Sequence, residues 1–266
     1  MTEGTGPAPE RLDWGAPWYA PWRQPGERVA GLVSGGTAQA LNLGWALVPT
    51  VYASETPQTV GTSAHPTFVT QDRLPEAEPY ERFIFECNAI PTRDNLHDFF
   101  NGLCWLRLPR TKRQLNRLQA GEIAAGGIGA RRGPVRDAVT VFDENGAVLS
   151  APAPLWEALL ARQWRRLFVD LRPLWTQAQL LVIGHALLEK LAAPRKDLTA
   201  HVWREPAPAG SPAELDAWLA ERCTAERLAA KPFTPLPVLG IPGWWAPNQN
   251  FSFYDDSMVF RPRRGA

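Results

Sequence analysis

The sequence predicts an α+β fold that is mainly helical, in a single domain with a β-hairpin and long Pro/Trp-rich termini that wrap around it. Three observations support this prediction. Residues 91–116 (PTRDNLHDFFNGLCWLRLPRTKRQLN) carry apolar side chains at helical spacing. Residues 136–150 (RDAVTVFDENGAVLS) place Asn-Gly between apolar residues, as β-hairpins do. The 26 prolines and 12 tryptophans of the 266-residue chain favour irregular segments that large apolar rings pin to a core.

The N-terminus is predicted as an extended arm over residues 1–28. Trp14, Trp18 and Trp22 recur every four residues, but the two prolines between them prevent a regular helix. A tryptophan platform that stacks on sugars or bases is the functional alternative. The remainder, residues 29–266, is predicted to form one globular domain.

The other elements follow from local patterns of apolar residues and caps. Residues 205–230 are predicted as a peripheral linker followed by a helix that Ser211 caps. Residues 54–78 are polar and contain prolines, which favours a surface loop. We also expect helices in residues 29–48, 80–90, 154–164 and about 174–191, a strand in 197–204, and a tightly packed wrap in 231–264.

Composition excludes several classes of protein. The net charge of +1 argues against a protein that binds nucleic acid mainly through its global field. The N-terminal residues MTEGTGPAPERLDWG show no secretory signal, and no apolar run approaches 18 residues, so we expect a cytoplasmic protein without a membrane span. The three cysteines are widely spaced and form no CxxC motif, which indicates reduced thiols that act as small buried hydrophobes. The sequence gives no indication of the oligomeric state.

One face of the helix predicted in the first part of residues 91–116 gathers reactive side chains. We expect Pro109 to end or kink this helix, and a second segment to begin after it. At about 100° per residue, four short polar side chains fall on one stripe: Asp94, His97, Asp98 and Asn101. We expect Thr92 to cap this helix, with Asp94 in its first turn. A histidine between aspartates can act as a general base or as a metal ligand that a carboxylate orients. The alternative is the solvated face of an amphipathic helix.

A second polar pair lies in the apolar segment that starts near residue 174, where His185 and Glu189 are one helical turn apart. The two side chains either satisfy one another or face the first helix across a cleft. The predicted catalytic residues are therefore His97, Asp98, Asp94, Asn101, His185 and Glu189. The predicted metal ligands are His97, His185 and Glu189, with Asp143 or Asp256 as a further carboxylate. Such ligands suit a divalent manganese, iron or zinc ion.

A basic block follows the first helix directly. Residues 107–136 hold eight basic residues and one acid, so eight minus one gives a local charge of +7. Within this block we expect Arg136, or Arg110 together with Lys112, to hold a small molecule that is phosphate-bearing or otherwise anionic. The glycine-rich segment 126–133 (GGIGARRG) would cradle a phosphate or form a flexible loop, since no Walker lysine follows it.

Four blocks of the chain resemble a proteobacterial family catalogued as domain of unknown function family 3025. In order they are PTRDNLHDFFNGLCWLRLPRTKRQLN, RGPVRDAVTVFDENG, LVIGHALLEKLAAP and FTPLPVLGIPGWWAPNQNFSFYDDSMVFRP. The resemblance spans roughly residues 75–262 and carries no activity, substrate or fold with it.

Three functions stay open on the sequence alone. The favoured hypothesis is a hydrolase with a His/Asp site, metal-assisted or not, that acts on an anionic ligand. The second is a module that binds single-stranded nucleic acid or a phosphate ligand through the basic block and exposed tryptophans. The third is a structural or interaction protein whose polar stripe is a buried hydrogen-bond network.

Overall fold

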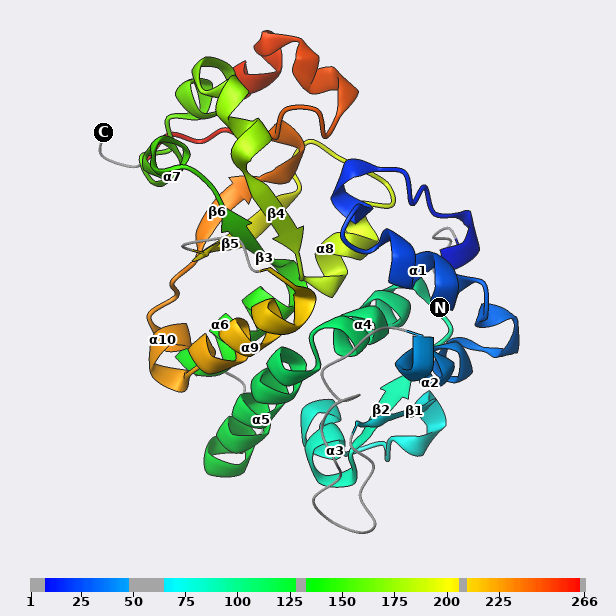
Figure 1. Cartoon of the computed structure of the whole chain (residues 1–266). Coiled ribbons are helices and arrows are strands. Elements are labelled where there is room, and N and C mark those ends of the chain that lie inside the picture. Colours follow the sequence, from blue (N-terminus) through cyan, green and yellow to red (C-terminus); the bar gives the residue numbers. More distant parts are fainter. Residues whose placement is uncertain (1–7, 48–64, 128–132, 206–209, 264–266) are drawn as a thin grey trace. The chain divides into compact units, whose positions relative to one another are not determined.

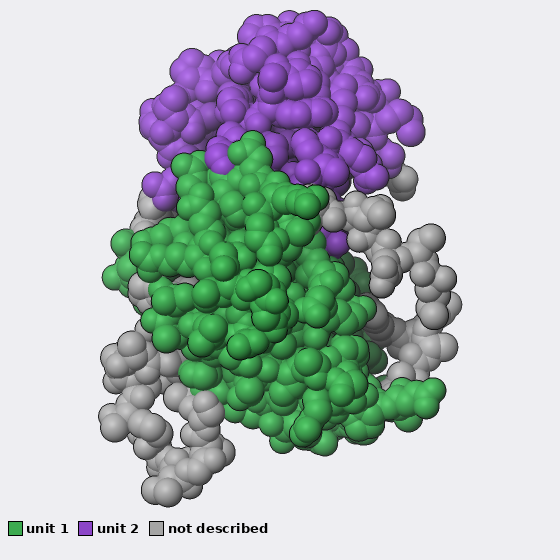
Figure 2. Space-filling view, turned by 90° about the vertical axis from the view of Figure 1, so that its right-hand side faces the viewer, with its two compact units in different colours: residues 1–14, 22–143, 209–231 green, residues 15–21, 144–208, 232–266 purple. Residues whose placement is uncertain are grey.

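The computed structural model describes residues 8–47, 65–127, 133–205 and 210–263 (Figure 1). Its fold is α+β and mainly helical, as the sequence predicts. No helix in these ranges combines the length and the apolar character that crossing a membrane requires. The chain divides into two compact units, each built from separate stretches of sequence (Figure 2).

Unit 1 comprises residues 1–14, 22–143 and 209–231 and is predominantly helical. It also holds a two-stranded parallel sheet of β1 (Thr67–Thr70) and β2 (Ala89–Thr92). Its helices are α1 (Arg23–Ala30), α2 (Thr37–Leu47), α3 (Tyr80–Cys87), α4 (Leu96–Arg107), α5 (Pro109–Gly126), most of α6 (Pro134–Asn145), α9 (Pro212–Arg222) and α10 (Ala225–Ala229). Helix α9 begins at the cap that the sequence predicts, because the Ser211 hydroxyl accepts a hydrogen bond from the Glu214 amide.

Helix α4 is the central helix of the sequence prediction, but it starts later than predicted. Thr92 is the last residue of β2, and the N-cap is Asn95, whose side chain accepts a hydrogen bond from the Asp98 amide. The β1–β2 pairing, which the sequence did not reveal, keeps residues up to Thr92 extended. As predicted, Pro109 separates α4 from a second helix, because it opens α5 at a position that needs no backbone donor.

Unit 2 comprises residues 15–21, 144–208 and 232–266. Its centre is a four-stranded sheet in the order β4-β3-β5-β6, with β3 parallel to β5 and the other pairs antiparallel. The strands are β3 (Gly146–Ser150), β4 (Gln179–Val182), β5 (Thr199–Glu205) and β6 (Thr234–Pro237), and the α-helices of this unit are α7 (Ala153–Leu160) and α8 (His185–Lys190).

The core of unit 2 includes a cluster of aromatic rings around Phe168. Its ring centroid lies 5.2 Å from that of Tyr254, 5.7 Å from that of Trp175 and 6.0 Å from that of Phe260. Two of these rings come from the proline-rich C-terminal segment, which contains only β6 and short 3-10 helices. Aromatic burial therefore holds this segment in place, as the predicted wrap requires.

The position predicted for the β-hairpin is wrong. Residues 134–145 form helix α6, because Val135, Ala138, Val139 and Phe142 at spacings of three and four bury one helical face. The Asn145–Gly146 pair marks the passage from this helix to β3. The antiparallel neighbour of β3 is instead β4. Helix α7 and further helical segments separate these two strands in the chain.

The long helix predicted from about residue 174 is also wrong. Residues 172–177 form a 3-10 helix, Gln179–Val182 form β4, and only His185–Lys190 form a helix, α8. A continuous apolar run has no period that distinguishes a buried strand from a buried helix. His185 and Glu189 nevertheless remain one turn apart, because both lie on α8.

The N-terminal tryptophans belong to the core. Trp14, Trp18 and Trp22 are 7%, 8% and 0% exposed, which rules out a stacking platform for sugars or bases. The arm is irregular only in part, because it includes two short 3-10 helices and the start of α1 at Arg23. Burial of large rings thus explains the tryptophans without a ligand.

Candidate functional site

The aspartates of the predicted stripe hold local structure together. Asp94 precedes α4 and accepts a 2.7 Å hydrogen bond from the Thr37 amide, at the first residue of α2. Asp98 is buried and accepts from both the backbone amide and the guanidinium of Arg93, at 2.7 to 3.0 Å. Their oxygens therefore have donors, and the catalytic roles of Asp94 and Asp98 stay predictions.

His97 and Asn101 keep the helical spacing that the sequence predicts, since both lie on α4 one turn apart. Asn101 is buried, and its amide nitrogen donates a 3.1 Å hydrogen bond to the Tyr80 hydroxyl. Tyr80 is the first residue of α3. Burial, followed by the charges of three nearby carboxylates, raises the pKa of Tyr80 well above its ordinary value. Tyr80 is therefore a neutral hydroxyl at physiological pH.

A group of buried and half-buried side chains in unit 1, which we call the lysine cluster, consists of Glu81, Lys112, Asn116 and Asp143. The Lys112 ammonium forms a 2.5 Å ion pair with Asp143, and Asn116 donates to Glu81 at 2.7 Å. Burial is the largest single effect and lowers the pKa of Lys112, but the charge of Asp143, its hydrogen bond and the charges of Cys104 and Glu81 together outweigh it, so the pKa is raised. The ion pair therefore keeps a buried lysine charged.

The residues predicted to hold an anion, Arg110, Lys112 and Arg136, differ in their surroundings. Lys112 is balanced by Asp143. Arg110 and Thr111 donate their backbone amides to Asp216, which caps the start of α5 with its side chain. Burial raises the pKa of Asp216, while these amide bonds act in the opposite direction. Arg136 is half-buried on α6. Most of the glycine-rich segment predicted to cradle a phosphate, residues 128–132, lies outside the described residues.

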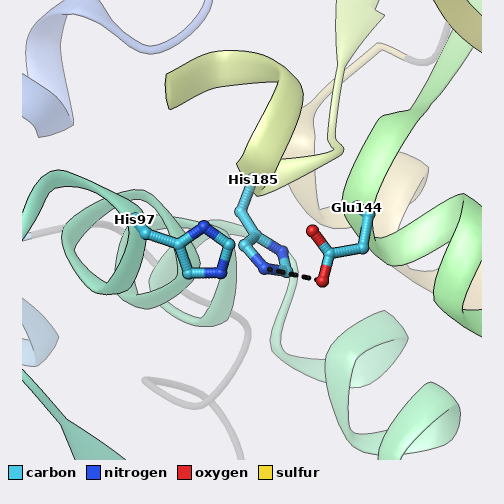
Figure 3. Close-up of side chains that lie close together, drawn as sticks. All are labelled: His97, Glu144 and His185. Atoms are coloured by element: carbon cyan, nitrogen blue, oxygen red, sulfur yellow. Dashed lines mark ion pairs between the residues drawn. The ribbon is translucent and has the colours of Figure 1, made fainter. Parts of the chain in front are cut away.

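In unit 2, the imidazole of His185 meets the carboxylate of Glu144. His185 Nε2 lies 3.7 Å from Glu144 Oε1, which is the ion pair drawn in Figure 3. His185 is 5% exposed and opens α8, whereas Glu144 lies near the end of α6. The sequence suggested that Glu189 and His185 could satisfy one another, and that pairing stays a prediction. The structure also places the carboxylate of Glu144 near His185.

The backbone fixes how Glu144 and His185 approach. The amides of Ile183 and Gly184 both donate to the carbonyl oxygen of Gly146, at 3.0 and 2.8 Å. A side chain on Gly184 would lie only 2.5 Å from the backbone of Asn145, so only glycine fits at this crossing. The end of α6 and the start of α8 are thereby held close together.

Three side chains in the described part of the chain could share a metal ion, and we call them the histidine cluster: His97, Glu144 and His185. Each offers one ligand atom, and these atoms lie within 4.8 Å of one another (Figure 3). His185 is buried, and the other two are half-buried. The cluster contains Glu144 where the sequence suggested Glu189, and the metal-binding role of all these residues stays a prediction.

The sequence interpretation missed Glu144 because it assigned that residue to the turn of a hairpin. Acidic turn residues usually serve solubility, so the residue carried no signal. A helical assignment would have placed Asp143 and Glu144 side by side near the end of α6, pointing to different neighbours. Of the other carboxylates considered, Asp143 pairs with Lys112 and Asp256 pairs with Lys196.

The comparison with protein families confirms the resemblance seen in the sequence. The family described as protein of unknown function (DUF3025) matches residues 66–264. The chain belongs to this family. The matched region includes His97, Glu144 and His185 as well as the lysine cluster. Neither a curated protein nor a solved structure matches the chain.

Proposed function

We propose that this member of the DUF3025 family is a metal-dependent hydrolase, in which His97, Glu144 and His185 hold one divalent cation. The observation that supports the proposal is the grouping of their three ligand atoms within 4.8 Å. Two imidazoles and one carboxylate are a ligand set used by catalytic zinc sites, and they also suit manganese and iron. Three protein ligands leave a coordination position for water, which the ion would activate as a nucleophile.

Glu144 and His185, the two ligands that belong to unit 2, need only a small movement to bind one ion. Ligands at about 2.1 Å from one ion in a tetrahedral site lie about 3.4 Å from each other. The Nε2–Oε1 distance between His185 and Glu144, 3.7 Å, is already close to that value.

Burial of His185 strengthens the proposal. A buried imidazole beside a carboxylate has a fixed orientation, and orientation of a histidine ligand by its surroundings raises metal affinity. The start of α8 is fixed by the Gly146 carbonyl, so His185 is presented by rigid backbone rather than by a loop.

The test is metal affinity measured by equilibrium dialysis and elemental analysis, on protein purified without a polyhistidine tag. We expect Zn²⁺ or Mn²⁺ to bind at one ion per chain, and His97→Ala, Glu144→Gln and His185→Ala each to weaken binding by more than about 100-fold. The chain offers matched controls in its two other histidines, so His65→Ala and His201→Ala should leave the affinity unchanged.

Two results would contradict the proposal. One is wild-type protein that binds neither ion under these conditions. The other is metal affinity that survives the loss of His97 and of His185, since the ion would then lie elsewhere. Hydrolysis of a phosphate monoester and of an amide is then assayed with and without chelator. The comparison shows whether the substrate is the anion expected from the sequence or a neutral molecule.

A further inference from the structure

The Tyr80–Asn101 pair of unit 1 leaves hydrogen-bonding capacity unused in a buried place. Asn101 is 7% exposed, and its nitrogen donates to the Tyr80 hydroxyl. Its oxygen Oδ1 is buried and has no hydrogen-bond partner in the part of the chain that the structure describes. A buried polar atom without a partner destabilises the folded state, so it calls for an explanation.

The Tyr80 hydroxyl has the complementary unused capacity, which is a proton that it could donate. It accepts from Asn101, and among the described residues nothing accepts its own proton. If the amide of Asn101 were turned by 180°, Tyr80 would donate to Oδ1, and the amide N–H and a Tyr80 lone pair would be open instead. Either orientation leaves one donor and one acceptor side by side.

Position links this pair to the proposed site. Asn101 follows His97 by four residues on α4, and such residues lie on one helical face with about 5–6 Å between their Cβ atoms. A molecule bound at His97 would therefore be within reach of Asn101 and Tyr80.

Charge restricts what the pair would bind. Glu81, Asp98 and Asp143 all act on the Tyr80 hydroxyl and disfavour a negative charge there. The cations nearest to these acids, Lys112 and Arg93, are already engaged with Asp143 and Asp98. An anion would meet three carboxylates, whereas a neutral group that donates and accepts one hydrogen bond would meet matching partners.

We propose that Tyr80 and Asn101 form a binding position for a carboxamide of the substrate. An amide N–H would donate to Asn101 Oδ1, and an amide carbonyl would accept from the Tyr80 hydroxyl. Amide binding itself does not depend on the proposed metal site, because both residues of the binding position lie within unit 1. Only the hydrolysis of the bound amide rests on the proposed function. It changes the substrate class from the anion expected on the sequence to an amide.

The experiment is ¹⁹F NMR of protein labelled with 3-fluorotyrosine, with acetamide, acetate and inorganic phosphate as probes, since a primary carboxamide carries its carbonyl and one N–H on the same edge. The chain has four tyrosines, and Tyr80→Phe identifies the Tyr80 resonance. Two others are internal controls, since Tyr19 donates to the Leu188 carbonyl and Tyr254 to the Gly240 carbonyl, both at 2.8 Å. Titrations are run with chelator and with Zn²⁺.

We expect acetamide to shift the Tyr80 resonance saturably in both conditions, with no shift at Tyr19 or Tyr254. Acetate and phosphate should shift it little. Asn101→Leu should weaken amide binding by about tenfold, the effect of one hydrogen bond. If Asn101→Leu does not fold, Asn101→Ala makes the same test with a smaller change.

The inference is overturned by the absence of a saturable amide shift, which would mean that the pair holds only a trapped water. It is equally overturned by an equal response to acetate or phosphate, or by full amide affinity in the Asn101 variants. The two proposals fail separately. Amide binding in chelator without any Zn²⁺ affinity removes only the metal site, and Zn²⁺ affinity without amide binding removes only this inference.

Discussion

Asp143 and Glu144 are neighbours on α6, yet they belong to polar clusters of opposite kinds. In the lysine cluster, Asp143 meets Lys112 at 2.5 Å, and the hydrogen bonds around it are short. In the histidine cluster, Glu144 lies 3.7 Å from His185, too far for a direct hydrogen bond. A short ion pair of largely buried groups contributes to the fold, whereas ligand atoms that lie near one another without a short bond suit a metal site.

The strongest test of this comparison replaces the two neighbours one at a time. Asp143→Asn should cost about 3–5 kcal/mol of unfolding free energy, because it leaves the buried Lys112 charge without its partner. Glu144→Gln should cost less than about 1 kcal/mol, because its side chain is 34% exposed and the pair is long. Urea unfolding at neutral pH measures both values.

The expected cause of the Asp143 effect can be checked in the same assay. Lys112→Met combined with Asp143→Leu removes both charges and should recover most of the stability that Asp143→Asn loses. Equal losses in Asp143→Asn and Glu144→Gln would show that the two clusters do not differ in the way we describe.

A second prediction concerns the thiols of unit 1, which test how strongly its interior disfavours negative charge. Burial raises the pKa of Cys104 and of Cys223 from 9.0 to about 12. Unfolded thiols ionise above pH 9 while folded ones stay protonated, so stability is complete below pH 9 and is lost as the pH rises toward 12. At about 1.4 kcal/mol per pH unit and thiol, the loss at pH 10 is about 3 kcal/mol.

Urea unfolding under reducing conditions at pH 8, 9 and 10 measures this loss. The variant Cys104→Ala should remove about half of the dependence on pH between 9 and 10, whatever its effect at pH 8. Replacement of Cys87, which is exposed, is the matched control and should leave the dependence unchanged. An unaltered pH dependence in Cys104→Ala would show that other groups cause it.

The contrast between the clusters also shows how far the sequence could predict the structure. Periodicity revealed α4 and its stripe, because amphipathic spacing depends only on neighbouring residues. It placed His97 and Asn101 on one face. It could not show that Asp94 caps α2 or that Asp98 binds Arg93, because both bonds depend on where the chain turns before α4.

The assignment of residues 136–150 failed for a similar reason. An Asn-Gly pair between apolar residues suits a hairpin locally, but the burial of Val135, Ala138 and Phe142 on one helical face favours a helix. This error concealed Glu144 and the pairing of Asp143 with Lys112. Contacts between α6 and residues distant in the chain, such as Lys112, do not show in local sequence patterns. The partners of the predicted residues could therefore be identified only from the structure.

The smallest predicted effect tests whether rigid backbone positions the histidine cluster. A methyl group at Gly184 would lie 2.5 Å from the backbone of Asn145, so Gly184→Ala must displace the start of α8 or the end of α6. We expect a loss of about 1–3 kcal/mol in unfolding free energy. Because Glu144 and His185 flank this crossing, zinc affinity should fall as well.

Gly121 provides the control, because it lies inside α5 and a methyl group there would meet nothing within 4 Å. Gly121→Ala should stabilise the protein by up to about 1 kcal/mol through helix propensity and leave zinc affinity unchanged. If Gly184→Ala lowers stability but not zinc affinity, the ligands adjust by their own rotation, and the backbone crossing serves the fold alone. If both quantities fall together, the crossing that only glycine permits is part of the site.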